Sequence, residues 1–409
     1  MRAARFLAVL LPVHVALAVP GPPAPSSIQL QSSWEGNVSR IILVYSQTAE
    51  VGLASMIDIL EALPHEQAII INQFALSSPS FEIFSSTLAQ GRKGATGAKR
   101  PNLYFVQDAR AYGPWPRDQA VVDAAGRMWV SAGDHHQLRP VFDSLDETYG
   151  IERHDLPLEF AGANLLSCGS VVLHPDRLDV SALEEVLEGT LVALPSPPLP
   201  ERFHLDLLVM PLSDSLVVVG DDGMARTVLE ALTPEECTAI VARWSAEFAA
   251  SAGNMDYAVR GGRLSFRRNM KPALILWPFI RDKLRLLASL APPEAFAAAV
   301  QQQPPYEWDD RIAEALRTRG FTVVRVPFWP GSIHSPNRHT PHLPTIAYPN
   351  CLVWDDGIIM PVYGITALDS VATRVYRRVS GRTVHHMRGG AILGFGSSGP
   401  HCLTLEFRE

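Results

Sequence analysis

The stretch GSSGPHCLTLE at residues 396–406 decides how the rest of the chain is interpreted. Cys402 follows a glycine-rich turn, and the segment after it is so short that we expect no core role for this cysteine. The thiolate is the reactive form of cysteine, and glycines let a substrate approach the sulfur without obstruction by Cβ atoms. The stretch therefore predicts a nucleophilic cysteine.

Four polar clusters lie upstream, each beside an apolar, strand-like run: WPRD at 115–118, GAN at 162–164, HLD at 204–206 and YPN at 348–350. A cysteine and a histidine alone would fit a cysteine protease, with the histidine as base. Asp118 and Asp206 do not fit that use, because they place negative charge beside an anionic nucleophile. Two carboxylates suit a cation, and a planar guanidinium pairs with them through its five N–H donors.

The order of apolar patterns along the chain indicates the fold class. Short runs rich in Val, Ile, Leu and Phe alternate with amphipathic helical patterns, which predicts an α/β fold. The strand-like runs are residues 40–45, 68–71, 103–106, 119–122, 207–219 and 322–326, and the helical patterns are residues 54–63 and 182–187.

Residues 233–303 depart from this alternation, since they are alanine-rich and helical throughout. Proline followed by glutamates starts a helix at residue 234 and another near residue 293. We interpret the stretch as a helical insertion that could cover the site or contact a large partner. Ordinary connecting helices packed on a sheet are the alternative.

Bulk composition limits the partners. The chain has 409 residues, of which 47% are hydrophobic, and this length allows one to three domains. Its net charge of −7, without basic clusters, argues against nucleic acid as the main partner, because phosphate binding needs stripes of Lys and Arg.

The N-terminus has the pattern of a signal peptide. Arg2 and Arg5 precede an apolar run at residues 6–19, and the small residues at 16–18 form a cleavage site. We therefore expect a signal peptide at residues 1–18, a Pro-rich linker at 19–36, one catalytic domain at 37–409 and a secreted or periplasmic enzyme. The apolar run is too short to span a membrane, and no later stretch is long and uncharged enough.

Export affects the interpretation of the cysteines, because an oxidising compartment favours disulfides. Cys168, Cys237, Cys351 and Cys402 could pair in three ways. Cys168 and Cys351 lie in apolar runs, where a free cysteine behaves as a small hydrophobic residue, so we expect no pairing that consumes Cys402. The remaining histidines lack the spacing of a zinc site, and we expect neither a metal nor an organic cofactor.

The five clusters together resemble the motifs of the guanidine-modifying pentein superfamily. W-x-R-D, a G-G-N-like element, H-x-D, Y-x-N and a near-terminal H-C-hydrophobic-T occur in the family's order from about residue 41 onward. The resemblance is closest to the branch that holds agmatine deiminases and bacterial, Porphyromonas-type peptidylarginine deiminases. It implies a five-bladed α/β propeller of pseudo-fivefold strand-strand-helix-strand units, with the site at its centre and the helical stretch as an addition.

The resemblance also implies roles for individual residues. Cys402 would attack the guanidinium carbon, and His204 would protonate the departing ammonia and then activate water. Asn350 would support the nucleophile by hydrogen bonding. The remaining residues would bind the substrate or hold other side chains in place: Asp118 and Asp206 on the guanidinium nitrogens, Trp115 as a wall, Arg117 beside Asp118, and Asn164.

Two departures bear on the substrate. The agmatine- and arginine-deiminase pattern has a glutamate directly before its Gly-Gly-Asn element, where this chain has Ala161. Glu159, two residues before Ala161, lies on the same strand face and is the candidate replacement for the missing glutamate. We expect it not to take that role. Arg139 is a candidate ligand for a substrate carboxylate, which agmatine lacks, and a solvated loop arginine is the alternative.

These observations predict an exported hydrolase that converts peptidyl or free arginine to citrulline and ammonia. An agmatine deiminase giving N-carbamoylputrescine is the first alternative. A non-catalytic pentein that binds guanidinium ligands or proteins is the second, and transfer of the amidino group to an amine is a weaker one. The sequence does not predict the oligomeric state.

Overall fold

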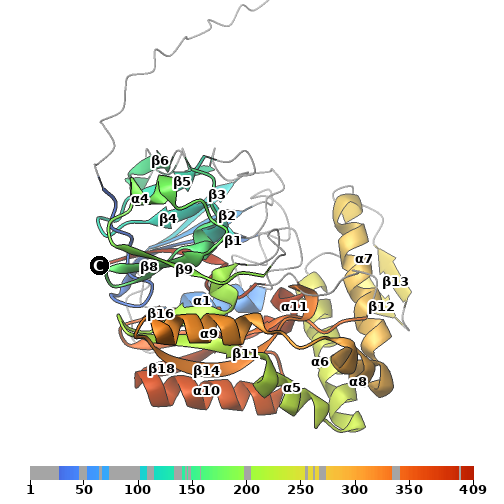
Figure 1. Ribbon diagram of the computed structural model, residues 1–409. Coiled ribbons are helices and arrows are strands. Elements are labelled where there is room, and N and C mark those ends of the chain that lie inside the picture. The colour runs from blue at the N-terminus through green and yellow to red at the C-terminus, as the bar shows by residue number, and fades with distance from the viewer. Residues whose placement is uncertain are drawn as a thin grey trace, which may run out of the picture.

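The computed structural model of the protein describes residues 27–45, 53–63, 67–72, 102–107, 115–132, 141–142, 145, 149–156, 158–197, 204–253, 257–260, 263–266, 273–333, 341–395 and 398–409. It is a mixed α/β structure whose strands form several small sheets instead of one continuous sheet (Figure 1). The predicted α/β class is thus confirmed.

Among the described strands, five sheets share one plan. In each, a first strand pairs antiparallel with a second, and the second pairs parallel with a third. A parallel neighbour requires a crossover connection, and described helices supply it in the first, third, fourth and fifth of these sheets. The same three-stranded unit is therefore repeated along the chain.

The five units are numbered by the order of their middle strands along the chain. The first unit is β19 (Thr404–Arg408), β1 (Val38–Tyr45) and β2 (Gln67–Asn72), extended by β3 (Asn102–Gln107). The second is β4 (Ala120–Val122), β5 (Met128–Ser131) and β6 (Arg153–Leu156), and the third is β7 (Leu166–Cys168), β8 (Val171–Pro175) and β9 (Thr190–Leu194). The fourth is β10 (Val209–Pro211), β11 (Leu216–Asp221) and β14 (Thr322–Trp329), extended by β15 (Ile346–Ala347), and the fifth is β16 (Leu352–Trp354), β17 (Gly357–Pro361) and β18 (Thr383–Met387).

Single helices connect the second and third strands of three units: α1 (Leu53–Ala62), α4 (Ser181–Glu184) and α10 (Thr366–Ser380). The helix expected at residues 182–187 is shorter than predicted, because Leu187 forms a bridge with Ile28 beyond the last helical turn. The long strand expected at 207–219 is divided into β10 and β11, since Ser213 Oγ accepts hydrogen bonds from the backbone N of Ser215 and Leu216 and forms a turn.

The fourth unit contains the helical stretch that the sequence predicted. Its crossover consists of α5 (Asp222–Glu230), α6 (Pro234–Gly253), α7 (Ala273–Leu290), α8 (Pro293–Gln302) and α9 (Trp308–Thr318). A hairpin that the sequence did not predict, β12 (Tyr257–Arg260) with β13 (Arg263–Phe266), interrupts it. Figure 1 shows α6, α7, α8 and this hairpin as a lobe at one side of the sheets.

The start of α6 illustrates how local sequence fixes these boundaries. Pro234 occupies the first helical turn, the Glu236 backbone N donates to Thr233 Oγ1 at 3.2 Å, and the Thr233 backbone N donates to Glu236 Oε2 at 2.8 Å. This reciprocal pair is a capping box, which satisfies donors that a helix leaves unpaired. The helix start predicted from the proline and glutamates is therefore present.

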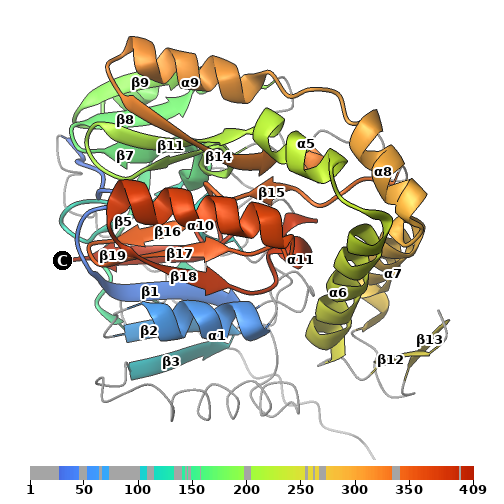
Figure 2. The ribbon, with the colours of Figure 1, turned by 90° about the horizontal axis from the view of Figure 1, so that it is seen from below.

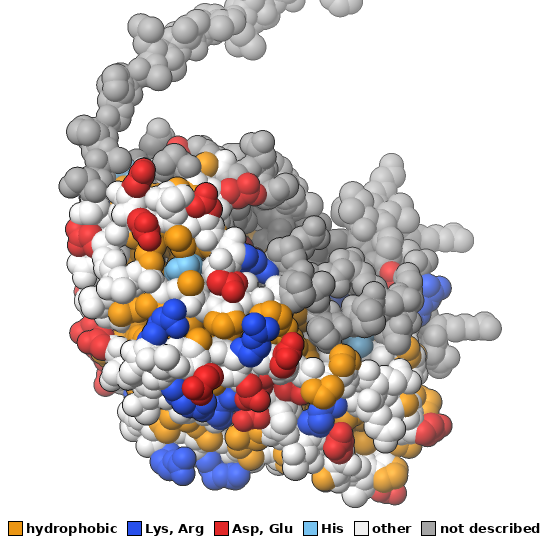
Figure 3. All heavy atoms as spheres, in the orientation of Figure 1, with side chains coloured by type: hydrophobic (Ala, Val, Ile, Leu, Met, Phe, Trp, Pro, Cys, Tyr) orange, Lys and Arg blue, Asp and Glu red, His pale blue; other side chains and the backbone are white. Residues whose placement is uncertain are grey.

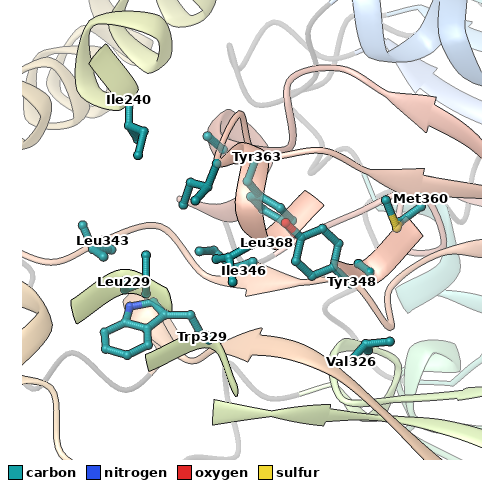
Figure 4. Close-up of a cluster of buried hydrophobic side chains, with 14 of the residues drawn as sticks. Leu229, Ile240, Val326, Trp329, Leu343, Ile346, Tyr348, Met360, Tyr363 and Leu368 are labelled. Atoms are coloured by element: carbon teal, nitrogen blue, oxygen red, sulfur yellow. The ribbon is translucent and has the colours of Figure 1, made fainter. Parts of the chain in front are cut away.

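The lobe is joined to the sheets by a shared core. Ile240, Trp244 and Phe248 of α6 belong to the same buried cluster as Tyr348, Met360 and Tyr363 of the fifth unit. The Trp244 indole N donates to the Tyr363 carbonyl at 2.6 Å. Figure 4 shows part of this cluster, with Ile240 at the upper left, Tyr363 near the centre and the Tyr348 ring to the right.

The first unit joins an early strand to the last strand of the chain. β19, near the C-terminus, pairs antiparallel with β1, whose Ile41, Ile42, Leu43 and Val44 are at most 2% exposed. Ile28 and Leu30 are also buried, and Gln31 Nε2 donates to the Glu406 carbonyl at 3.2 Å. Packing therefore begins by Ile28, within the region predicted as linker, while residues 1–26, with the predicted signal peptide, lie outside the described residues.

The surface and the helices give limited further information. On the face drawn in Figure 3, acidic and basic side chains are interspersed over the described sheets and helices. In the part of the chain that the structure describes, no helix combines the length and apolar character needed to cross a membrane. All four cysteines are free and buried.

Candidate active site

The predicted polar clusters occupy equivalent places in the repeated units. Each directly precedes the first strand of its unit, and three form short 3₁₀ helices: η1 (Pro116–Asp118), η2 (Gly162–Asn164) and η3 (Leu205–Leu207). In four clusters a backbone N donates to the carbonyl three residues earlier: Asp118 to Trp115, Asn164 to Ala161, Leu207 to His204 and Asn350 to Ala347. One turn geometry thus presents side chains from separate units.

Close packing of these turns requires a glycine. A Cβ atom on Gly162 would lie 2.3 Å from the Arg117 carbonyl O and 2.4 Å from that of Ala120. Real Cβ atoms do not approach a backbone this closely, so only glycine lets η2 lie against η1.

Cys402 is enclosed by side chains from two other turns. Its Sγ accepts a hydrogen bond from Asn350 Nδ2 at 3.0 Å and donates to Asp206 Oδ2 at 3.2 Å. The Cys402 backbone N donates to Asn350 Oδ1 at 3.3 Å. Cys402 is only 1% exposed and belongs to an apolar cluster, so our expectation that it lies outside the core was wrong. Pairing of β19 with β1 buries the thiol despite the short segment that follows it.

Asp206 connects the thiol to a residue whose role the sequence did not predict. His401 Nδ1 lies 2.8 Å from Asp206 Oδ2, the same oxygen that accepts from the thiol. His401 and Asp206 are 1% and 0% exposed. In the sequence, His401 appeared only as the first residue of the near-terminal H-C-hydrophobic-T motif, without a role of its own.

His204 and Asp118 form the part of the cluster that reaches solvent. His204 Nδ1 lies 3.3 Å from Asp118 Oδ1, and the two side chains are 24% and 22% exposed. One ligand atom each from His204, Asp206 and Cys402 lie within 4.8 Å of one another. The structure therefore brings together five predicted residues: Cys402, His204, Asp118, Asp206 and Asn350.

Two shielded carboxylate oxygens of this cluster accept no hydrogen bond from the described residues. Asp206 Oδ1 has no partner there, and Asp118 Oδ1 has only its 3.3 Å ion-pair contact with His204 Nδ1. Buried carboxylate oxygens without partners are rare, because removing them from water costs free energy that only a donor recovers. Their presence beside a thiol indicates a place for a ligand that carries N–H donors.

The electrostatic environment keeps the thiol neutral in the absence of such a ligand. Burial raises the pKa of Cys402 well above its ordinary value, and the carboxylates of Asp206 and Asp118 raise it further. Burial also raises the pKa of Asp118 to about 6, against the opposing charge of His204. A bound cation would act in the other direction on both groups, because it stabilises the thiolate and the carboxylate.

Arg117 has a different partner from the one predicted. Its guanidinium pairs with the buried carboxylate of Glu406 on β19, not with Asp118. Glu406 also receives Arg408, with Nη2 and Oε1 3.4 Å apart. Although burial alone would raise the pKa of Glu406, the two guanidinium groups lower it to about 2. Arg117 therefore ties η1, which carries Asp118, to the strand that follows Cys402.

Trp115 and Asn164 hold the turns in position. The Trp115 indole N donates to Ser398 Oγ at 3.0 Å, and its ring packs against the apolar cluster that contains Cys402. Asn164 Oδ1 accepts from the Leu205 backbone N at 2.8 Å, directly after His204. Asn164 thus contacts η3, and its Oδ1 already accepts a hydrogen bond.

The two remaining candidates are not part of the described cluster. Glu159 is exposed, and its neighbours Leu158 and Phe160 pack on a different apolar cluster from the one that contains Cys402. Arg139 lies outside the described residues. Among the residues that the structure describes, no third carboxylate joins Asp118 and Asp206 in the contacts around Cys402.

A single divalent cation is the other ligand that this donor set could hold. Among the described residues, His204, Asp206 and Cys402 are the one such group. Three protein ligands with an open position are typical of catalytic zinc. The two carboxylate oxygens that accept no hydrogen bond from the described residues instead favour a larger ligand with several N–H groups.

Comparison with known proteins places this geometry in a fold. No protein-family model matches the chain, and no curated protein matches it. Solved structures do. An agmatine deiminase from C. jejuni has 12% identity and a TM-score of 0.54, and the match covers 93% of this chain and 96% of that one.

Two further solved structures are similar over nearly the whole chain. An agmatine deiminase from Enterococcus faecalis has 11% identity, a TM-score of 0.53, and coverage of 94% of this chain and 96% of that one. A protein from Porphyromonas gingivalis, provisionally described as an arginine deiminase, has 13% identity, a TM-score of 0.51, and coverage of 93% and 98%. At such identities the likeness concerns the fold alone, and the chain shares the mixed α/β fold of these solved structures.

Proposed function

We propose that this protein is a guanidine-deiminating hydrolase with Cys402 as its nucleophile. The observation that carries the proposal is the pair of buried carboxylate oxygens beside the Cys402 thiol, one on Asp118 and one on Asp206, that accept no hydrogen bond from the described residues. A guanidinium group supplies the N–H donors and the positive charge that this arrangement lacks. The repeated three-stranded units support a five-bladed propeller with this cluster at its centre.

Binding of the substrate would itself prepare the nucleophile. A guanidinium held by Asp118 and Asp206 offsets the two charges that raise the pKa of Cys402. Asn350, which already donates to Sγ, then stabilises the thiolate. The thiol proton, hydrogen-bonded to Asp206 Oδ2 before the substrate binds, passes to His204, so that Asp206 remains a carboxylate on the guanidinium.

The reaction follows from these positions. The thiolate attacks the guanidinium carbon and forms a C–S bond; one C–N bond breaks, and His204 protonates the nitrogen that leaves as ammonia. Water, deprotonated by His204, then attacks the thiouronium carbon and displaces Cys402. The products are ammonia and a ureido group, which is citrulline when the substrate is an arginine side chain.

For the substrate we propose peptidyl or free arginine outside the cytoplasm, with residues 1–18 as a cleaved signal peptide. The absence of a carboxylate at Ala161, together with the exposed position of Glu159, supports this choice over agmatine. Agmatine is the second candidate, because solved structures with a similar fold include agmatine deiminases.

The test measures ammonia and ureido product from the purified protein without residues 1–18. Agmatine, free arginine, and peptides with an internal or a C-terminal arginine are compared, with Cys402→Ala as the control. Turnover of an arginine substrate that vanishes in the control supports the proposal, and turnover of agmatine alone selects the second candidate. No turnover of any of them, with the Cys402 thiol shown to be free, would contradict both and favour a non-catalytic binding protein.

A further inference from the structure

A groove separate from the Cys402 cluster lies where the helical lobe meets the fifth unit. It has a cavity volume of about 790 Å³, within the range of small-molecule pockets. One wall is α6, and the other comprises α10 and the chain after β17 and β18. Figure 2 shows α6 beside the end of α10 that faces α11 (Gly390–Gly394).

The groove is basic although the protein as a whole is acidic. Four arginines line it, Arg243, Arg374, Arg377 and Arg388, against two carboxylates, Glu247 and Asp369, while the chain has a net charge of −7. His386 is the remaining titratable group in the lining. The guanidinium groups come from α6, α10 and the end of β18, so no single helix explains their convergence.

Other contacts or burial limit how well each carboxylate can pair with these arginines. Asp369 accepts hydrogen bonds from Tyr348 Oη at 2.7 Å and from the Tyr363 backbone N at 2.9 Å. Burial raises the pKa of Glu247 against the opposing charges of Arg243 and Arg388, and its Oε2 accepts no hydrogen bond from the described residues. Two carboxylates against four guanidinium groups leave the lining with an excess of positive charge.

Two of the arginines are held in place by other contacts. Arg388 pairs with Asp58 of α1, Nη2 to Oδ1 at 2.7 Å, and Arg243 Nη1 donates to the Gly364 carbonyl at 3.1 Å. These contacts fix the guanidinium groups at the two walls. A fixed guanidinium loses less conformational entropy when it binds an anion than a freely rotating one.

The other two arginines have no partner. Arg374 and Arg377 lie three residues apart on α10, are exposed, and make no hydrogen bond or ion pair within the described part of the chain. Like charges at this spacing repel one another across the helix surface. The dipole of α10 favours cations in its last turn, which accounts for Arg377 and Arg378 but not for Arg374 one turn earlier.

We propose that this groove binds a small oxyanion with several negative charges, either a phosphate or a polycarboxylate. Planar guanidinium forks match both groups bidentately, and four forks around one cavity can engage a ligand with two or more such groups. The proposal is independent of the deiminase reaction, because none of these residues belongs to the Cys402 cluster.

The experiment is a calorimetric titration of the protein without residues 1–18. Pyrophosphate is the ligand in one series and citrate in the other. Arg374→Ala/Arg377→Ala is compared with Arg317→Ala/Arg378→Ala, which makes the same change in net charge at exposed positions outside the groove. We expect at least one probe to bind, with an affinity about tenfold or more lower in the groove variant and nearly unchanged in the control. Which probe binds more tightly distinguishes phosphate from carboxylate recognition.

Two outcomes would overturn the proposal. Equal weakening in both double variants would show that the anions respond to net charge alone, and the lack of binding of either probe to the unchanged protein would exclude the site. Circular dichroism checks that each variant is folded, and Arg374→Gln/Arg377→Gln replaces the alanine pair if it is not.

Discussion

At the scale of single residues, burial disfavours the ionisation of both the Cys402 thiol and the Asp118 carboxylate. Burial, together with the carboxylates of Asp206 and Asp118, raises the pKa of Cys402, and burial raises the pKa of Asp118 to about 6. Both groups are therefore arranged for a positively charged ligand between them. Without the ligand the arrangement costs free energy, which is typical of a binding site and not of a structural ion pair.

Asp118→Asn separates two effects of this carboxylate: it contributes to the raised pKa of Cys402, and in the proposed reaction it binds the guanidinium group. Removing a negative charge near Sγ lowers the pKa of Cys402, so alkylation of Cys402 by iodoacetamide at pH 8 should become faster, by about tenfold for each pKa unit. Turnover of a guanidinium substrate should fall by about 10²-fold or more, because the substrate loses a charged partner. Mass spectrometry of the Cys402 peptide follows the alkylation, and a slower reaction in the variant would contradict the assignment.

At the scale of elements, the turn before β19 depends on a close approach to the turn before β16. A Cβ atom on Gly399 would lie 2.6 Å from Asn350 Oδ1 and 2.7 Å from the Asn350 carbonyl O. The backbone atom cannot move without displacing the turn. The bond between Asn350 and Sγ therefore depends on the absence of a side chain at residue 399.

Gly399→Ala should accordingly separate Asn350 from Cys402. We expect kcat/KM to fall by about 10²-fold, as for a displacement of reacting groups by about 1 Å, and the free energy of unfolding to fall by about 1–3 kcal/mol. Gly223→Ala on α5 is the control, since its Cβ would meet only Asp221 Oδ1 at 3.4 Å, an ordinary contact. Full activity of the Gly399 variant would show that this turn tolerates displacement.

At the scale of the whole molecule, a buried cluster links the start of the second unit to the C-terminal strand. Glu406 on β19 lies between Arg117 and Arg408, and its side chain is 1% exposed. Its pKa of about 2 lies below that of an exposed glutamate, about 4.3. A carboxylate with a lowered pKa stabilises the folded state above the unfolded pKa, and this stabilisation disappears as the pH falls toward 2.

Glu406→Gln should therefore reduce the free energy of unfolding by about 3 kcal/mol at pH 7. The difference from the unchanged protein should shrink as the pH falls from about 4 to 2, because the glutamate is then protonated. Urea unfolding at several pH values measures this difference, with the exposed Glu314→Gln as the control. A constant difference across that range would mean that Glu406 is not ionised in the folded protein.

The sequence alone predicted the fold class and the residues that converge, because both depend on residue types in a fixed order along the chain. Alternating apolar patterns predicted the α/β class, and polar clusters before strand-like runs predicted which side chains converge. Asp118, His204, Asp206, Asn350 and Cys402 are indeed together, since one turn recurs before the first strand of each unit.

Contacts between residues distant in sequence were decided only by the tertiary structure. The pairing of Arg117 with Glu406, the contact of His401 with Asp206, and the burial of Cys402 all depend on β19 adding to the sheet of β1. The basic groove likewise needs α6 and α10 to meet. Local patterns do not encode such contacts, because hydrophobic burial and ion pairing act between side chains that become neighbours only after the chain has closed.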